Sequence, residues 1–115
     1  MIIGTGIDIV KIPRIITSVE KHGDRFIEKI LSPDEIRQIP RVNKYEYIAG
    51  RFAVKEAFIK AAGTSMPFAG ITVLNDETGK PFIASIPSDK IDLSKIHVSI
   101  SHDGDYAVAS VLIEG

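Results

Sequence analysis

The segment RFAVKEAFIKAAGT, residues 51–64, decides how this chain folds, because its apolar residues follow a helical spacing that four charged residues interrupt. At about 100° per residue, Arg51 and Lys55 lie about 40° apart on a helix, and Glu56 and Lys60 form a second pair about 140° away. Apolar side chains fill the surfaces between the two pairs, so we expect the helix to be packed on two sides. Because such charges are almost never fully buried without partners, they must reach solvent, pair with each other or meet a ligand.

The composition predicts one globular domain over residues 1–115, with 44% hydrophobic and 25% charged residues. A chain of this size can gain further stability from subunit contacts. The net charge of -1 predicts no general attraction to nucleic acid or to anionic membranes. The absence of cysteine excludes disulfides, thiolate nucleophiles and cysteine-ligated metals. The N-terminal MIIGTGIDIV is too short, and too interrupted by Asp8, for a secretory signal or a membrane span, so we expect a cytoplasmic protein.

The first part of the chain predicts a strand followed by short helices. An isoleucine-rich stretch over residues 2–10 predicts a buried strand, and helices are expected over 13–22 and 24–31. The motif SPDE at residues 32–35 combines an N-cap serine, a first-turn proline and a capping-box glutamate, which marks the start of another helix.

The second part predicts a long helix and then four strands. The helix is expected over residues 43–63, ending in a glycine that suits a left-handed C-cap. Beyond it the apolar period changes to two. Residues 71–86 predict two strands joined across 75–79, and residues 96–113 predict two more joined by a turn at 102–105. This order predicts an α+β fold in which the long helix packs on a mainly antiparallel sheet.

Asp8 is the first candidate for chemistry, because a carboxylate in an isoleucine-rich strand needs a cation or several donors to offset its desolvation. It shares a strand face with Gly4 and Gly6, which have little bulk. Mg²⁺ characteristically binds through one or two carboxylates, with waters and phosphate oxygens as its other ligands. Asp8 and Glu56 together would supply the two carboxylates, and Lys60 would neutralise the charge of the phosphate. The structural alternatives are a cap or salt bridge for Asp8 and an i,i+4 ion pair between Glu56 and Lys60.

The stretch SISHDGD, residues 99–105, is a second candidate. Ser101 and His102 lie near a strand end, where they could bind a phosphate or only satisfy the amides of the turn. Other common motifs are missing: no arrangement suggests a Ser/His/Asp triad, and GTGID lacks the dinucleotide fingerprint because Ile9 occupies the position of its third glycine.

Taken together, these segments resemble the holo-(acyl-carrier-protein) synthases, the small bacterial 4'-phosphopantetheinyl transferases. The resemblance spans nearly the whole chain, and its most specific part is the central helix. The matching segments are GTGIDIVKIPRI (4–15), GRFAVKEAFIKAAGT (50–64), TGKPFI (78–83) and HVSISHDGDYAVA (97–109).

The resemblance implies a Mg²⁺-dependent transfer of 4'-phosphopantetheine from coenzyme A to a serine of an acidic acyl carrier protein, which releases adenosine 3',5'-bisphosphate and supports fatty acid biosynthesis. By the same resemblance, Asp8 and Glu56 are metal ligands that hold the ion against the pyrophosphate. Glu56 also assists deprotonation of the serine, and Lys60 stabilises charge on the pyrophosphate. This combination of a metal, a cation and a positioned nucleophile is common in phosphoryl transfer.

The resemblance further implies a homotrimer with active sites at the subunit interfaces, so that residues of one site can come from different chains. Arg51, Gly63, Ser101 and His102 match family positions near the nucleotide and its phosphates, whereas Lys55 belongs to the signature without a defined role. The carrier protein would dock on basic residues of the first helices, to which Arg14, Lys21 and Arg25 correspond. The alternative for those three is a solvated helix face.

Two other classes of function compete with this interpretation. One is a Mg²⁺-dependent phosphohydrolase, for which the sequence offers few carboxylates. The other is an oligomeric binding module that keeps the fold without the chemistry.

Overall fold

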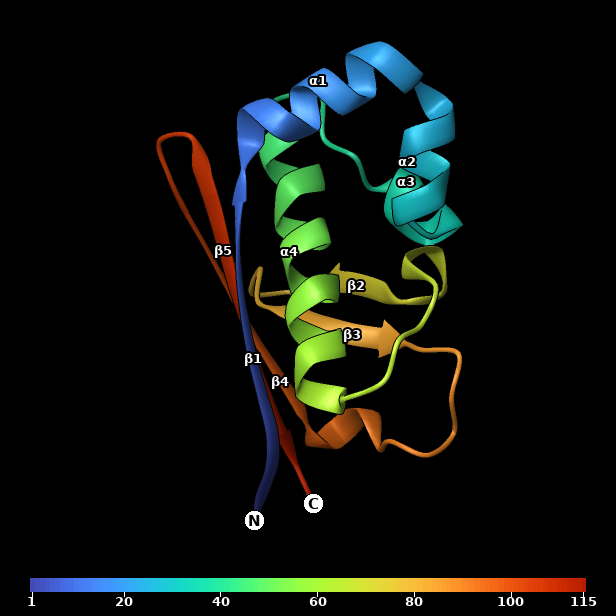
Figure 1. Cartoon of the computed structure of the whole chain (residues 1–115), viewed down its shortest axis with the longest axis vertical. Coiled ribbons are helices and arrows are strands. Elements are labelled where there is room, and N and C mark those ends of the chain that lie inside the picture. The colour runs from blue at the N-terminus through green and yellow to red at the C-terminus, as the bar shows by residue number, and fades with distance from the viewer.

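The computed structural model describes residues 1–115 and contains the expected order of one strand, helices and four strands (Figure 1). The elements are β1 (Ile2–Lys11), α1 (Ile12–His22), α2 (Asp24–Ile30), α3 (Pro33–Arg37), α4 (Lys44–Ala62), η1 (Phe68–Gly70), β2 (Thr72–Asn75), β3 (Pro81–Ser85), η2 (Leu93–Lys95), β4 (Ile96–Asp103) and β5 (Tyr106–Glu114). The long helix α4 lies along one face of a sheet, and the shorter helices gather near its N-terminal half. The predicted α+β fold is confirmed.

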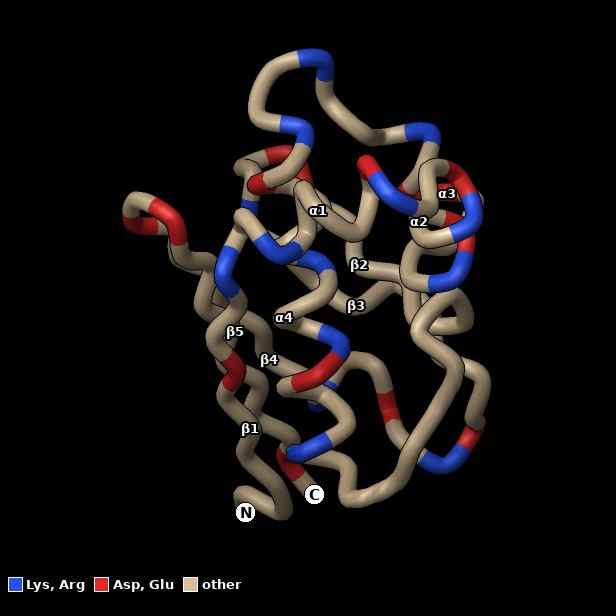
Figure 2. Tube along the Cα trace, turned by 45° about the horizontal axis from the view of Figure 1, so that its top comes forward, with Lys and Arg blue, Asp and Glu red and all other residues tan.

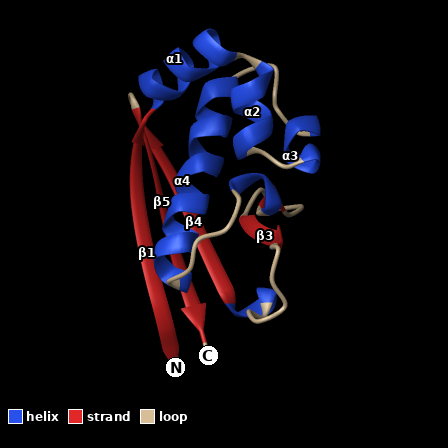
Figure 3. Cartoon of the chain, turned by 45° about the vertical axis from the view of Figure 1, so that its right-hand side comes forward, coloured by secondary structure: helices blue, strands red, loops and turns tan.

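The five strands form two antiparallel sheets, whereas the sequence predicted one. The larger sheet has the order β1-β5-β4, with β5 in the centre (Figure 3), and the smaller one pairs β2 with β3 (Figure 1). Alternation of apolar residues identifies strands but does not specify which strands pair, so this division was not visible in the sequence. The expected turn at 102–105 is also shorter, because β4 continues to Asp103 and only Gly104 and Asp105 form the turn.

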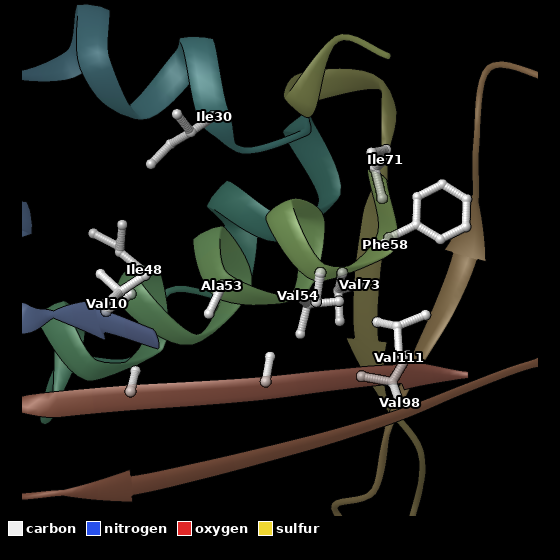
Figure 4. Packing of buried hydrophobic residues seen from close by; sticks show 14 of the residues in the cluster. Val10, Ile30, Ile48, Ala53, Val54, Phe58, Ile71, Val73, Val98 and Val111 are labelled. Atoms are coloured by element: carbon white, nitrogen blue, oxygen red, sulfur yellow. The ribbon is translucent and has the colours of Figure 1, made fainter. Parts of the chain in front are cut away.

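Helix α4 is packed on two sides, as its two apolar surfaces predicted. One side lies on the larger sheet, and the helix also packs against α1. Its side chains bond to Ile30 at the end of α2, to Phe68 of η1 and to Asn75 of β2. Figure 4 shows Val54 of α4 directed toward Val73, Val98 and Val111 of the two sheets. Although most of α4 is buried, neither it nor any other helix is both long and apolar enough to cross a membrane.

Two local signals in the sequence are confirmed at helix ends. Ser32 and Glu35 form the expected capping box at the start of α3. Gly63 ends α4 with a φ of 72°, and its N–H donates to the carbonyl of Ile59. These features depend only on neighbouring residues, which is why sequence alone could identify them.

Gly4 and Gly6 allow the backbone of β1 to lie directly against the backbone of α4. A Cβ atom on Gly4 would lie 2.0 Å from the carbonyl oxygen of Ala61, and one on Gly6 would lie 1.9 Å from that of Ala57. Both distances are far below van der Waals contact, so no larger residue fits without separating the strand from the helix. The two glycines therefore set the distance between the elements that carry Asp8 and Glu56.

We expect Gly6→Ala to lower the free energy of unfolding by about 3 kcal/mol, because the added methyl group overlaps the helix backbone. Urea unfolding followed by circular dichroism measures the change. Thr5→Ala is the matched control, since Thr5 is exposed on the opposite face of β1, and it should change the free energy by less than about 1 kcal/mol. Equal stability of Gly6→Ala and the wild type would contradict the close contact.

Candidate active site

Asp8 of β1 and Glu56 of α4 line the same pocket, which has a volume of about 460 Å³. Asp8 follows Gly6 on β1, and Glu56 directly precedes Ala57, whose carbonyl oxygen is the atom that Gly6 approaches. The backbone contact thus brings the two predicted metal ligands to one site. The rest of the wall includes residues of α1, α2 and α4, among them Arg14, Ser18, Phe26 and Phe52.

Lys60 lies beside Asp8 rather than forming the i,i+4 ion pair with Glu56. Its ammonium nitrogen donates to the carbonyl oxygen of Ile7 at 2.9 Å and is 3.4 Å from Asp8 Oδ1. The Lys60 side chain remains 54% exposed, so it can turn a proton donor toward a ligand. Gly63 ends the helix three residues later. Figure 2 shows the acidic and basic positions of α4 on the part of the helix that runs beside β1.

The donor set fits a magnesium ion that is shared with a phosphate ligand. Nowhere in the chain do three His, Asp or Glu side chains gather to hold a metal by themselves. An ion held by Asp8 and Glu56 would need further oxygens from water and from a phosphate. That is the usual way in which Mg²⁺ binds at phosphate-transfer sites.

Arg51 lies at a different pocket, on the other side of α4. Its side chain is buried, its Nη2 donates to Asn75 Oδ1 at 3.0 Å, and its guanidinium carbon is 4.2 Å from the centre of the Tyr47 ring. Burial lowers the pKa of the Arg51 guanidinium, which the neighbouring Tyr47 partly opposes. Its Nε is buried without a hydrogen-bond partner. The pocket has a volume of about 310 Å³ and also contains Gln38.

His102 also lies away from the carboxylate pocket. It is on β4, where its Nε2 is 3.1 Å from the carbonyl oxygen of Glu46 and close to Gly50 of α4. Asp8 is on β1, and β5 separates β1 from β4, so two strand spacings, about 10 Å, lie between these two edges of the sheet. Ser101 alternates with His102 and is exposed on the opposite face of the sheet.

Within one chain the predicted site residues therefore form separate groups. The structure brings together Asp8, Glu56 and Lys60 on the β1 side of α4. It does not bring Arg51, Ser101 or His102 to them.

Lys55 and Glu35 form a buried ion pair that the sequence analysis missed. Both side chains are fully buried, and Lys55 Nζ lies 2.5 Å from Glu35 Oε1. Burial lowers the pKa of the Lys55 ammonium group, and the charge of Glu35 opposes this shift. The sequence showed that Lys55 needs a partner and that Glu35 begins a helix, but no local pattern connects two residues that are 20 positions apart.

The basic residues predicted to bind a carrier protein lie on α1 and α2. Arg14, Lys21 and Arg25 are all exposed. Arg14 also lines the carboxylate pocket, and Arg25 lines a small surface pocket together with His22 and Lys29. Of the three, only Arg14 lines the carboxylate pocket.

Residues 4–111 match the 4'-phosphopantetheinyl transferase superfamily, and the chain belongs to this superfamily. Relatives that match this chain along almost its whole length are holo-(acyl-carrier-protein) synthases. The protein of that name from Halalkalibacterium halodurans is 50% identical over 121 aligned positions, which cover 99% of this chain and 97% of the relative.

Solved structures lead to the same group. The crystal structure of holo-(acyl-carrier-protein) synthase from Neisseria meningitidis superposes with a TM-score of 0.90 at 35% identity, and the match covers 100% of both chains. The enzyme from Helicobacter pylori, solved in complex with coenzyme A, gives a TM-score of 0.84 at 34% identity and covers 96% of this chain and 99% of that one. The fold described above is therefore that of this enzyme group.

The contribution of Tyr47 to the free energy of unfolding should depend on pH, and this dependence tests the packing around Arg51. Its hydroxyl donates to the carbonyl oxygen of Glu35 at 2.8 Å, and burial raises the pKa of Tyr47 above 10.0 while Arg51 opposes the rise. Just above that pH the unfolded chain loses the phenolic proton and the folded chain retains it, so this contribution to stability falls as the pH rises.

We therefore expect the stability advantage of the wild type over Tyr47→Phe, about 1 kcal/mol at neutral pH, to shrink between about pH 9 and about pH 11. Urea unfolding of both proteins across this range measures the difference. Between about pH 7 and about pH 8 the same difference should stay constant, which serves as the internal control. An advantage that grows with pH would contradict the raised pKa.

Proposed function

We propose that this protein transfers 4'-phosphopantetheine from coenzyme A to a serine of an apo acyl carrier protein, producing the holo carrier protein and adenosine 3',5'-bisphosphate for use in fatty acid biosynthesis. The observation that carries the proposal is the meeting of Asp8 and Glu56 in one pocket with Lys60 beside them. That constellation occurs in a chain whose relatives along almost its whole length are holo-(acyl-carrier-protein) synthases.

In this reaction the serine oxygen forms a bond to the phosphorus that carries the pantetheine arm, and the bond from that phosphorus to the bridging oxygen of the pyrophosphate breaks. Glu56 accepts the serine proton, directly or through a water molecule. Lys60 stabilises the negative charge that develops on the departing adenosine bisphosphate, which its exposed ammonium group can reach. Arg14, at the wall of the pocket, adds positive charge close to the phosphates.

Asp8 and Glu56 would hold Mg²⁺ against the pyrophosphate of coenzyme A. When bound, the ion supplies positive charge that polarises the phosphate attacked by the serine. The two carboxylates come from different elements, and the glycine contact between β1 and α4 keeps them near each other. This backbone contact would hold the two carboxylates in place before the substrates arrive.

We further propose that the protein is a homotrimer and that each active site combines two subunits. The outer face of β1 exposes three isoleucine side chains, Ile3, Ile7 and Ile9, each by more than 60%. A row of exposed apolar side chains is unusual in a protein that acts as a monomer and is typical of an interaction surface. A cyclic contact joins different surfaces of neighbouring copies. Such a contact would bring Arg51 and His102 of one subunit toward Asp8 and Glu56 of the next.

The carrier protein would dock on the exposed basic residues of α1 and α2, Arg14, Lys21 and Arg25. An acidic partner fits these charges, and Arg14 places the docking surface next to the carboxylate pocket. The serine of the bound carrier would then be close to Glu56. We also expect the protein to act in the cytoplasm and without a membrane as partner.

Incubation with apo carrier protein, coenzyme A and Mg²⁺ tests the function, with the mass of the carrier protein as the measurement. We expect the wild type to add one phosphopantetheine group. Glu56→Gln should lower the rate by about 100-fold or more, because it keeps the shape of the side chain but removes the base and a charge that holds the metal.

Asp89→Asn is the matched control, since Asp89 is an exposed carboxylate in the loop before η2, and it should transfer at the wild-type rate. Rapid transfer by Glu56→Gln would contradict the role of Glu56. Release of phosphate from nucleotides without any carrier protein, combined with no mass gain, would favour a phosphohydrolase instead.

The trimer is tested by analytical ultracentrifugation of Ile7→Lys. A lysine on the exposed face of β1 would place a charge in the proposed contact, so we expect the trimer to dissociate and transfer to fall by at least about 10-fold. Leu93→Lys, which adds the same charge at a partly exposed apolar residue of η2, should leave a trimer. A monomeric wild type with full activity would contradict the shared site.

A further inference from the structure

Lys55 is the only buried lysine in the chain, and all of its hydrogen-bond donors are used inside the protein. Its Nζ lies 2.5 Å from Glu35 Oε1, 2.6 Å from the carbonyl oxygen of Ile30 and 2.9 Å from that of Phe68. An ammonium group has three N–H donors, and these three acceptors take all of them. Lys55 therefore has no donor left for a phosphate, although it belongs to the same helical motif as Glu56 and Lys60.

Glu35 extends these bonds into a buried Lys55–Glu35 network, which consists of the two side chains and their backbone partners. Besides Lys55, Glu35 Oε1 accepts the N–H of Ser32 at 2.8 Å, and Glu35 Oε2 accepts the N–H of Val73 at 2.9 Å. The network thus joins the end of α2, the start of α3, η1 and β2 to a single position of α4.

That position is directly next to Glu56. Successive residues of a helix point about 100° apart, so Lys55 points into the buried network while Glu56 opens into the carboxylate pocket. Rotating or sliding α4 enough to move Glu56 would break the bonds of Lys55. The network also holds the carbonyl of Ile30 at the end of α2, the helix that supplies Phe26 to the wall of the pocket.

A buried ion pair of this kind constrains the positions of its neighbours more than it raises the free energy of unfolding. Both charges lose their hydration, so the pair contributes little when compared with neutral side chains of similar volume. It does require one arrangement of its neighbours, because each charge must keep its partners. Displacing a reacting group by about 1 Å can lower a rate by about 100-fold.

We propose that Lys55 and Glu35 are positioning residues, which fix the rotation of α4 and the distance of α2 so that the Glu56 carboxylate faces Asp8 across the pocket. This inference rests on the proposed function, since the purpose of the arrangement is to hold the metal and the serine. Lys55 itself touches neither substrate nor metal.

The test is the double variant Lys55→Met with Glu35→Gln, which removes both buried charges and keeps the volume. Its urea midpoint should fall, because the carbonyls of Ile30 and Phe68 lose their donor, but the chain should remain folded because no unpaired charge is buried. We expect kcat to fall by about 10-fold to about 100-fold and the dissociation constant for Mg²⁺ in the presence of coenzyme A to rise about 10-fold by calorimetry. The KM for the carrier protein should not change, because the basic surface of α1 is untouched.

Ile96→Ala is the matched control, since Ile96 is buried in β4, lies outside the Lys55–Glu35 network and does not line the carboxylate pocket. We expect it to lower the urea midpoint while kcat and the Mg²⁺ dissociation constant stay at wild-type values. Should the double variant not fold, Glu35→Asp alone provides the comparison, because aspartate keeps the negative charge beside Lys55 and shortens the side chain by one methylene group. A smaller rise in the Mg²⁺ dissociation constant, about 3-fold to about 10-fold, is then expected.

The outcomes separate this inference from the proposed function. A wild type that adds no phosphopantetheine to any carrier protein would overturn the function, while a weaker Mg²⁺ affinity in the double variant would still support the positioning role. An active wild type and a folded double variant with equal kcat and equal Mg²⁺ affinity would overturn the positioning role alone. Wild-type protein that binds no Mg²⁺ in the presence of coenzyme A would overturn both.

Discussion

The backbone contact between β1 and α4 is the constraint on which the candidate site depends. Gly4 and Gly6 let the strand lie against the carbonyl groups of the helix, at a distance that no side chain could share. Two carboxylates from segments far apart in the sequence, Asp8 and Glu56, consequently line one pocket. Because the contact involves the backbones of a strand and a long helix, the pocket has rigid walls that do not rely on loop conformation.

The four charges that interrupt the apolar pattern of α4 have different environments. Arg51 lies against Tyr47 and Asn75, and Lys55 is buried with Glu35. Glu56 and Lys60 share the β1 side of the helix, where Glu56 opens into the pocket and Lys60 lies beside Asp8. A helix packed on two sides can carry such charges only where each has a partner or a solvent-filled space. The spacing of the four charged residues along α4 therefore reflects the packing of the helix as well as the proposed metal and phosphate binding.

The separation of the predicted site residues gives the proposed trimer a physical purpose. In one chain, the carboxylate pocket and the Arg51 pocket lie on different sides of α4, and a single pocket does not contain both. Coenzyme A has a nucleotide at one end and the transferred arm beyond its pyrophosphate, so a long substrate can bridge two such pockets when neighbouring subunits bring them together. The exposed isoleucines of β1 provide an apolar surface for that contact.

The elements of the fold were predictable because their signals are local. The capping box of Ser32 and Glu35, the C-cap at Gly63 and the change of apolar period after the long helix were all confirmed. The presence of Asp8 on the face of the two glycines also followed from alternation alone, and it identified a carboxylate that needs a partner. Family membership followed from the order and spacing of these same motifs.

By itself, then, the sequence determined the strands and helices, the family and the residues that carry charge on the central helix, because periodicity, caps and motifs are properties of neighbouring residues. Only the tertiary structure decided that Lys55 pairs with Glu35, that the strands divide into two sheets, and that Arg51 and His102 lie apart from Asp8. Each of these depends on which distant segments meet when the apolar surfaces of the chain are buried together, and no local pattern encodes that meeting.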